Sequence, residues 1–152
     1  MRLADLLAER RQAVLAQATG ALERAHLAHY EAAGAALRRE RLERLYDLMS
    51  GAVAERNLTR LGKEAERIAH ERFAAGFGLA EVLSAFNVLE EATWTMLVAE
   101  LPAGELPEAL GLVATALGAG KDRLAASYVE LASRSHTPTL DLRALFEGVA
   151  GV

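Results

Sequence analysis

Cysteine is absent from this 152-residue chain, which excludes disulfides, thiolate metal ligands and cysteine nucleophiles. Proline and glycine are sparse, at 3 and 12 residues, and the apolar fraction of 52% can supply a core, so the composition excludes a disordered chain. Aromatic residues are also few, and leucine, alanine and valine must therefore fill most of that core. A chain of this length is expected to form one domain.

Export, membrane and nucleic-acid signals are also missing. The N-terminus, MRLADLLAERR, interleaves charge with leucine and lacks the apolar segment of a signal peptide, so we expect a cytoplasmic protein. The longest uncharged apolar run, residues 109–120, is well short of the roughly 20 residues of a membrane span. The net charge is −4, and acids interleave the basic run at residues 38–44, which favours a solvated helix face over a nucleic-acid surface.

Apolar residues recur at spacings of three and four, and no segment alternates as a strand would, which predicts an all-α antiparallel bundle. Gly20 is predicted to mark a kink or a close crossing, Gly34 to end a helix, Asn57 to cap one, and Gly120 to lie close to another backbone. The predicted helices are 2–33, 36–55, 57–75, 79–101 and 105–134, with a short sixth at 140–147. The boundary expected at Thr137-Pro138 separates a bundle domain, 1–134, from a linker and short helix, 135–152.

The predicted helix 79–101 is apolar around most of its circumference, so other helices must surround it. Helical periodicity places Glu90 on its apolar side and Arg72 on the apolar side of the preceding helix. Because a lone buried charge is costly, we expect Arg72 and Glu90 to pair across the Gly76–Gly78 turn. This pair has two interpretations: a structural ion pair that fixes helix register, or the polar part of a ligand pocket or subunit contact.

Catalytic and metal-binding motifs receive little support. Glu23-x-x-His26, with His29 nearby, has the spacing used by di-iron bundles, but no second such motif follows, and His70 has a glutamate at the wrong offset. The glycines match no phosphate-binding loop. We therefore predict no enzymatic activity, no metal and no cofactor, and keep a metal-dependent enzyme as the weakest alternative.

Three segments carry a family resemblance: HYEAAGAALRRERLERLYDLM, ERIAHERFAAGFGLAEVLSAFNVLEEATWTMLVAELP and ALGLVATALGAGKDRLAASYVELASRSH. Together they resemble the helical N-terminal domain of RsbRD-type proteins, the RsbT co-antagonist and stressosome-sensor family of bacterial stress signalling. The most specific part is the R-x-x-x-G-F order that begins at Arg72. The resemblance implies a dimeric, non-catalytic regulatory module, and related sensors leave a globin-like fold without haem as the structural alternative.

In that family the helical domain usually precedes an output domain, often of the STAS type. This sequence ends at Val152 without one, so a stand-alone regulator or a fragment is expected. The favoured function is thus a protein-interaction module of stress signalling that forms a homodimer, since the helix 79–101 is too apolar for four neighbours to cover. The alternative is a small-ligand binder with an apolar pocket lined by Phe77, Phe86, Trp94 and Tyr128.

Overall fold

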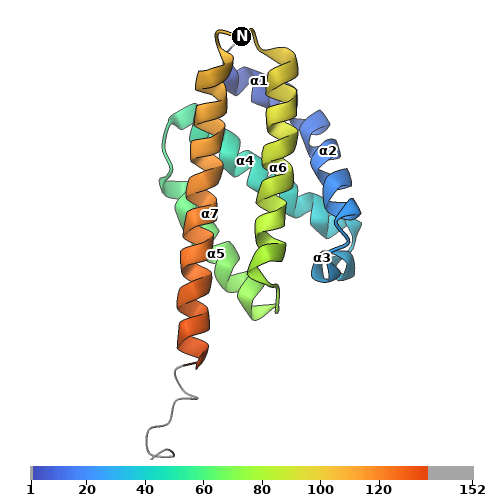
Figure 1. Ribbon diagram of the computed structural model, residues 1–152, viewed down its shortest axis with the longest axis vertical. Coiled ribbons are helices and arrows are strands. Elements are labelled where there is room, and N and C mark those ends of the chain that lie inside the picture. Colours follow the sequence, from blue (N-terminus) through green and yellow to red (C-terminus); the bar gives the residue numbers. More distant parts are fainter. Residues whose placement is uncertain (1, 137–152) are drawn as a thin grey trace, which may run out of the picture.

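A computed structural model of the chain describes residues 2–136, which form seven α-helices and no strand within that range (Figure 1). The prediction of an all-α helical bundle is confirmed, although the described residues contain seven helices where the sequence suggested five. In chain order they are α1 (Leu3–Glu9), α2 (Arg11–Arg24), α3 (Ala28–Ala33), α4 (Ala35–Glu55), α5 (Thr59–Ala74), α6 (Leu79–Glu100) and α7 (Leu106–His136).

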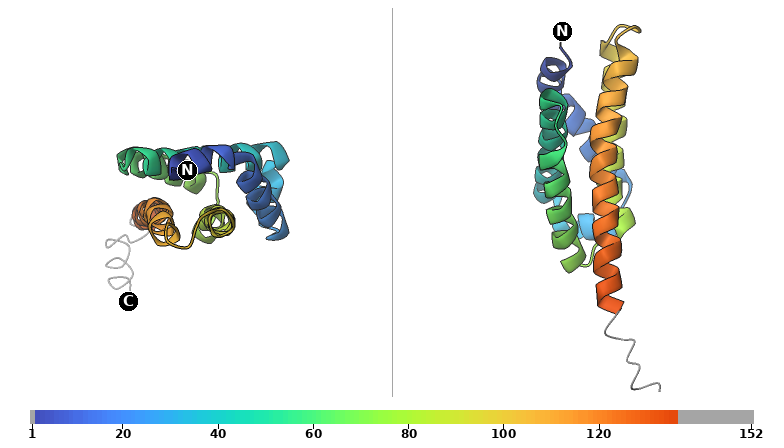
Figure 2. Two further views of the ribbon diagram at one scale, coloured as in Figure 1. Left: turned by 90° about the horizontal axis from the view of Figure 1, so that it is seen from above. Right: turned by 90° about the vertical axis from the view of Figure 1, so that its left-hand side faces the viewer.

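The helices form two layers (Figure 2). One layer is the hairpin of α6 and α7, which lie side by side and antiparallel. The other contains α1, α4 and α5, and α2 packs against both α6 and α4 at the side. One side of the α6–α7 layer therefore faces α4 and α5, while no helix of residues 2–136 covers its other side.

The prediction of a single helix over residues 2–33 is wrong, because two turns interrupt the helix in this segment. A turn at Arg10 separates α1 from α2, and a second turn follows α2, where His26 has a φ of 50°. A continuous helix would have turned His29 inward, whereas the second break turns Tyr30 inward, and only 2% of its surface is exposed. The helix α2 continues through Gly20, and the nearest atom to a Cβ there would be Arg24 Nη1 of the same helix, so Gly20 marks no close crossing with another helix.

The other predicted helices agree with the structure within a few residues. Gly34 ends α3 with a φ of 87°, a conformation that favours glycine. The residue directly before α5 is Leu58, one position after the predicted cap Asn57, but the Asn57 Oδ1 does accept a hydrogen bond of 2.9 Å from the N–H of Thr59, the first residue of the helix. The helix α7 continues to His136, and the predicted boundary at Thr137-Pro138 and helix at 140–147 lie outside the described residues.

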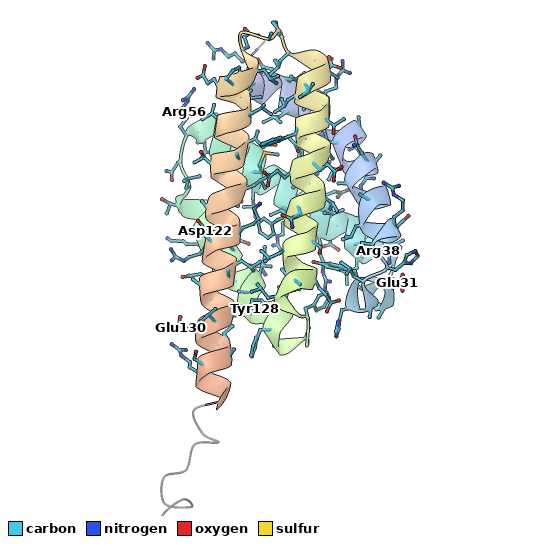
Figure 3. All side chains as sticks on the ribbon, viewed as in Figure 1. Glu31, Arg38, Arg56, Asp122, Tyr128 and Glu130 are labelled. Carbon is cyan, nitrogen blue, oxygen red and sulfur yellow. The ribbon has the colours of Figure 1, made fainter. Side chains whose placement is uncertain are left out.

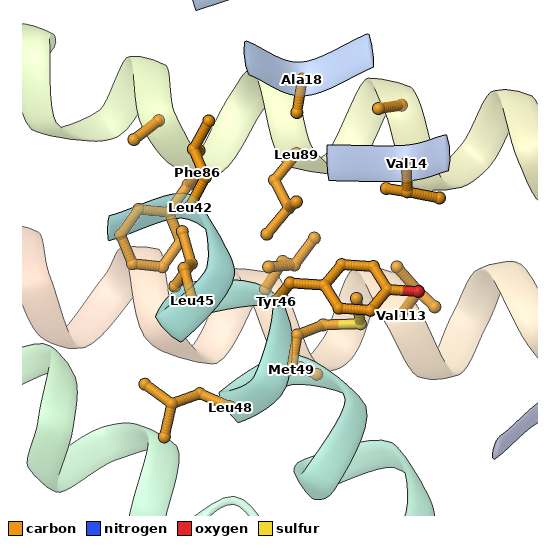
Figure 4. Close-up of a cluster of buried hydrophobic side chains, with 14 of the residues drawn as sticks. Val14, Ala18, Leu42, Leu45, Tyr46, Leu48, Met49, Phe86, Leu89 and Val113 are labelled. Carbon is orange, nitrogen blue, oxygen red and sulfur yellow. The ribbon is translucent and has the colours of Figure 1, made fainter. Parts of the chain in front are cut away.

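The hydrophobic core fills the space between the two layers (Figure 4). The buried Tyr46 donates a hydrogen bond from its hydroxyl to the Leu7 carbonyl, and burial raises the pKa of this tyrosine to about 12. The side chains labelled in Figure 4 belong to α2, α4, α6 and α7: Val14, Ala18, Leu42, Leu45, Tyr46, Leu48, Met49, Phe86, Leu89 and Val113.

Gly120 of α7 accommodates an aromatic ring from α6. A Cβ at this position would lie 2.9 Å from Cε1 of Phe86, closer than real Cβ contacts. The close approach predicted for Gly120 is therefore present, but the neighbour is a side chain rather than another backbone.

None of the seven described helices combines the length and the hydrophobicity needed to cross a bilayer.

Candidate functional site

The predicted ion pair between Arg72 and Glu90 is wrong. Nη1 of Arg72 donates to Oε1 of Glu71 at 2.7 Å, and Oε2 of Glu90 accepts from Nζ of Lys121 at 2.8 Å. The reason lies in the packing: α5 and α6 each pack along α7 rather than along one another. Arg72 is nevertheless buried as predicted, with 6% of its surface exposed. Glu90 is only partly buried, at the edge of α6 that faces α7.

The four aromatic residues predicted to line one pocket near Trp94 lie in three different places, and the surface depression at Trp94 is lined by none of the other three. Phe86 is in the core against Gly120. Trp94 lies on the outside of α6 with 39% of its surface exposed. Phe77 and Tyr128 do meet, since the Tyr128 hydroxyl donates to the Phe77 carbonyl at 3.1 Å. Figure 3 shows Tyr128 on α7 beside the start of α6.

The turn between α5 and α6 holds Phe77 in place. Gly76 has a φ of 85°, which lets the chain reverse after α5. The Glu81 carboxylate then accepts hydrogen bonds from the Gly78 N–H, the His29 N–H and the His29 ring, at 3.1, 3.2 and 2.7 Å. Burial raises the pKa of Glu81, but these hydrogen bonds outweigh it and the net pKa is lowered. The turn is thus tied both to α6 and to α3.

Phe77 is the centre of what we call the arginine–aromatic cluster, formed by Tyr30, Arg41, Arg72 and Phe77. The guanidinium carbons of Arg41 and Arg72 lie 5.2 and 5.8 Å from the Phe77 ring centroid, and the Tyr30 ring meets it edge-on at 5.1 Å. Cations at such distances are attracted by the ring quadrupole. The cluster brings together side chains from α3, α4, α5 and the turn before α6.

Charge is incompletely balanced in the arginine–aromatic cluster. Two of its buried nitrogens, Nη1 of Arg41 and Nε of Arg72, have no hydrogen-bond partner. Burial, and after it the positive charge of Arg72, lower the pKa of Arg41. Burial raises the pKa of Tyr30 against the opposing charges of both arginines and a hydrogen bond with Arg72, so the phenol stays neutral and supplies no negative charge.

A cleft opens beside the cluster, between α4 and α5, with a volume of about 80 Å³. Its charged lining consists of four arginines and two glutamates, so positive charge is in excess. The lining residues are Leu37, Glu40, Arg41, Arg44, Arg67, Ile68, Glu71 and Arg72.

The second candidate region is the uncovered side of the α6–α7 layer, which we call the outer face. Trp94 and Val98 lie one turn apart there and expose 39% and 58% of their surfaces. On α7 the outward positions recur at the helical period and include Val129, which is 63% exposed. The outer face comprises Asn87, Glu91, Trp94 and Val98 of α6 and Gly111, Gly118, Asp122 and Val129 of α7.

The histidines predicted as weak metal candidates have other partners. Nδ1 of His26 lies 2.7 Å from Glu31, while Glu23 faces Arg38 at 3.6 Å, so the Glu23-x-x-His26 motif does not converge. His29 is bonded to Glu81. Within residues 2–136 no three histidine or acidic side chains group as metal ligands would.

Sequence reasoning missed Arg41 and Tyr30. The basic run at residues 38–44 was interpreted as wholly solvated, but Arg41 precedes the buried Leu45 and Leu48 by four and seven residues, and that spacing places it at the edge of the buried face. No comparable signal was available for Tyr30, which depends on the break after α2.

Comparison with protein-family models, with curated proteins and with solved structures finds no match to this chain.

Proposed function

We propose that this protein is a non-catalytic regulatory module that binds a second copy of itself through the outer face. The observation that carries the proposal is the exposure of two large apolar side chains, Trp94 and Val98, on the outward side of α6. Tryptophan is enriched at the centres of protein interfaces, where it contributes much of the binding energy. The resemblance to RsbRD-type domains supports a role in bacterial stress signalling, in which such domains are dimeric.

The glycines of α7 also support the proposal that the outer face is the dimer interface. Glycine inside a helix costs about 1 kcal/mol relative to alanine. Gly120 is explained by the Phe86 ring, but a Cβ on Gly111 or Gly118 would meet nothing within 4 Å. Both lie on the outer face, where the absence of side chains would let a partner helix approach closely.

The extent of the outer face also suits a second copy. The 22 residues of α6 make a helix of about 33 Å, and two neighbouring helices are about 20 Å wide, which gives roughly 600 Å² for each partner. Standard interfaces bury about 800 Å² for each partner, so this surface is near the lower end of that class.

The ligand-binding alternative has weaker support. The surface depression at Trp94 is formed by α6 alone, from Asn87, Glu90, Glu91, Trp94, Thr95 and Val98. A small-molecule site is normally enclosed by several elements and buries most of its ligand. A depression on one helix suits a side chain of a partner better.

Light scattering coupled to size-exclusion chromatography tests the dimer, and Trp94 provides an independent signal because it is the only tryptophan. We expect a dimer whose tryptophan emission moves to longer wavelength on dilution. Val98→Glu should give a monomer. Leu58→Glu is the matched control, since Leu58 is 39% exposed but lies before α5 in the other layer. A wild-type monomer at every concentration, or equal effects of both substitutions, would contradict the proposal.

A further inference from the structure

The arginine–aromatic cluster contains an unusual combination of burial and unfulfilled hydrogen bonding. The side chain of Arg72 is only 8% exposed, yet its Nε has no partner, and Nη1 of the neighbouring Arg41 is also buried without one. A buried donor that lacks an acceptor costs about 1–3 kcal/mol, and more when it belongs to a charged group. Such donors ordinarily have partners in a folded protein.

The protein's own acids do not supply those partners. Glu71 bonds Nη1 of Arg72, but it also bonds Arg67 at 2.9 Å and its side chain is half exposed. The pKa of Glu71, which burial raises, is lowered overall by the hydrogen bond and charge of Arg72, so this carboxylate is ionised near neutral pH. Its single negative charge is therefore already shared between two arginines.

The cleft between α4 and α5 lies beside the two arginines that have an unpaired nitrogen. Both Arg41 and Arg72 line it. Its four arginines exceed its two glutamates by two charges. Its volume of about 80 Å³ fits one compact anionic group.

We propose that this cleft binds a tetrahedral oxyanion, either as free inorganic phosphate or as the phosphate group of a small metabolite. The guanidinium fork matches the oxygens of phosphate, and hydrogen bonds between two charged groups are the strong ones. The lining holds more positive than negative charge, which favours an anion, although Arg67 is also paired with Glu64, outside the lining, at 3.0 Å. The oxyanion accepts from the guanidinium groups of Arg41 and Arg72, which both line the cleft.

The test is thermal unfolding in inorganic phosphate, with sodium chloride at equal ionic strength as the reference. Because phosphate also stabilises proteins without binding them, we expect it to raise the melting temperature of the wild type, relative to the chloride reference, by more than it raises that of Arg41→Gln, with acetate weaker than phosphate. Arg41→Gln should weaken phosphate binding at least about tenfold, since it removes a charged donor. Arg72→Lys keeps the charge but removes the fork, and should weaken binding by a similar factor.

Arg123→Gln is the matched control, because Arg123 carries the same charge but pairs with Glu66, away from the cleft. It should bind phosphate within about twofold of the wild type. If glucose 6-phosphate stabilises the protein and inorganic phosphate does not, the phosphate group of a metabolite is the ligand. If neither exceeds chloride, or if Arg123→Gln weakens binding as much as Arg41→Gln, the proposal fails. The proposed dimer is measured separately, on the other layer, so the two failures are distinguishable.

Discussion

The arginine–aromatic cluster buries charged side chains, whereas the outer face exposes large apolar ones. Each arrangement is unfavourable unless a partner is present. In the cluster, Arg72 is buried with one nitrogen unpaired. On the outer face, Trp94 and Val98 are exposed. A chain selected only to fold would avoid both arrangements, because a buried charge and an exposed apolar patch each cost free energy or solubility. The comparison suggests two kinds of missing partner: an anion for the cluster and an apolar surface for the outer face.

Truncation of one aromatic residue in each region should separate them most strongly. Phe77→Ala removes a ring that contacts two arginines and Tyr30 and leaves a cavity, so we expect a loss of about 3–5 kcal/mol in the free energy of unfolding. Trp94→Ala should change the stability of the monomer by only about 0.5 kcal/mol, since Trp94 is partly solvated. Urea unfolding at low protein concentration, where the dimer dissociates, measures both. Similar losses in the two variants would show that Trp94 is also structural.

Two glycines of α7 sharpen the comparison, because one faces the core and the other the outer face. Gly120→Ala places a Cβ 2.9 Å from a ring carbon of Phe86, which should cost about 1–2 kcal/mol after the gain in helix propensity. Gly118→Ala meets open space and should stabilise the monomer by about 0.5–1 kcal/mol. Thermal unfolding of dilute protein gives the two signs. A stabilising Gly120→Ala would mean that the Phe86 ring moves at little cost.

A hydrogen bond, from the Tyr128 hydroxyl of α7 to Phe77, joins α7 to the arginine–aromatic cluster, and one substitution removes it. Tyr128→Phe deletes the hydroxyl that donates to the Phe77 carbonyl, and should cost about 1 kcal/mol. Burial raises the pKa of Tyr128 to about 12, so the hydroxyl stays protonated below that pH and the cost should be the same at pH 6 and pH 9. Chemical denaturation at the two pH values measures it. A cost that varied between them would imply that another group controls this contact.

The smallest expected effect concerns Glu71, whose lowered pKa makes its contribution depend on pH. An acid with a lowered pKa in the folded state stabilises the protein above its unfolded pKa of about 4.3 and loses that contribution as the pH falls through the folded value. Because the side chain is half exposed, solvent screening limits the effect to a few tenths of a kcal/mol. Glu71→Gln should therefore be slightly less stable than wild type at pH 7 and equal to it near pH 2. A difference that persists in acid would point to lost packing instead of lost charge.

The sequence predicted the helices well where glycine, proline or a capping side chain ended them, as at Gly34, Asn57 and Gly76–Gly78. It failed at the turn after α2, where Ala25-His26-Leu27 carries no such signal and the inward position of Tyr30 depends on tertiary packing. The candidate site shows the same limit. Periodicity predicted that Arg72 is buried, because the burial of a helical residue follows from its own helix.

Periodicity could not identify the partner of Arg72. Which helices pack together is decided by the whole set of apolar faces, and a short turn between α5 and α6 did not make them packed neighbours. The expected pair with Glu90 failed for that reason.

The contact between Phe86 and Gly120 also restricts how α6 and α7 can move. A slide of α7 by one helical turn, about 5.4 Å, would bring Ala116 or Leu124 opposite the ring in place of Gly120. Both carry a Cβ that would crowd the Phe86 ring. Gly120 therefore favours one position of α7 along its axis relative to α6. A slide of one turn would therefore cost at least about as much as Gly120→Ala, so this contact favours a rotation or a bend of α7 over a movement along its axis.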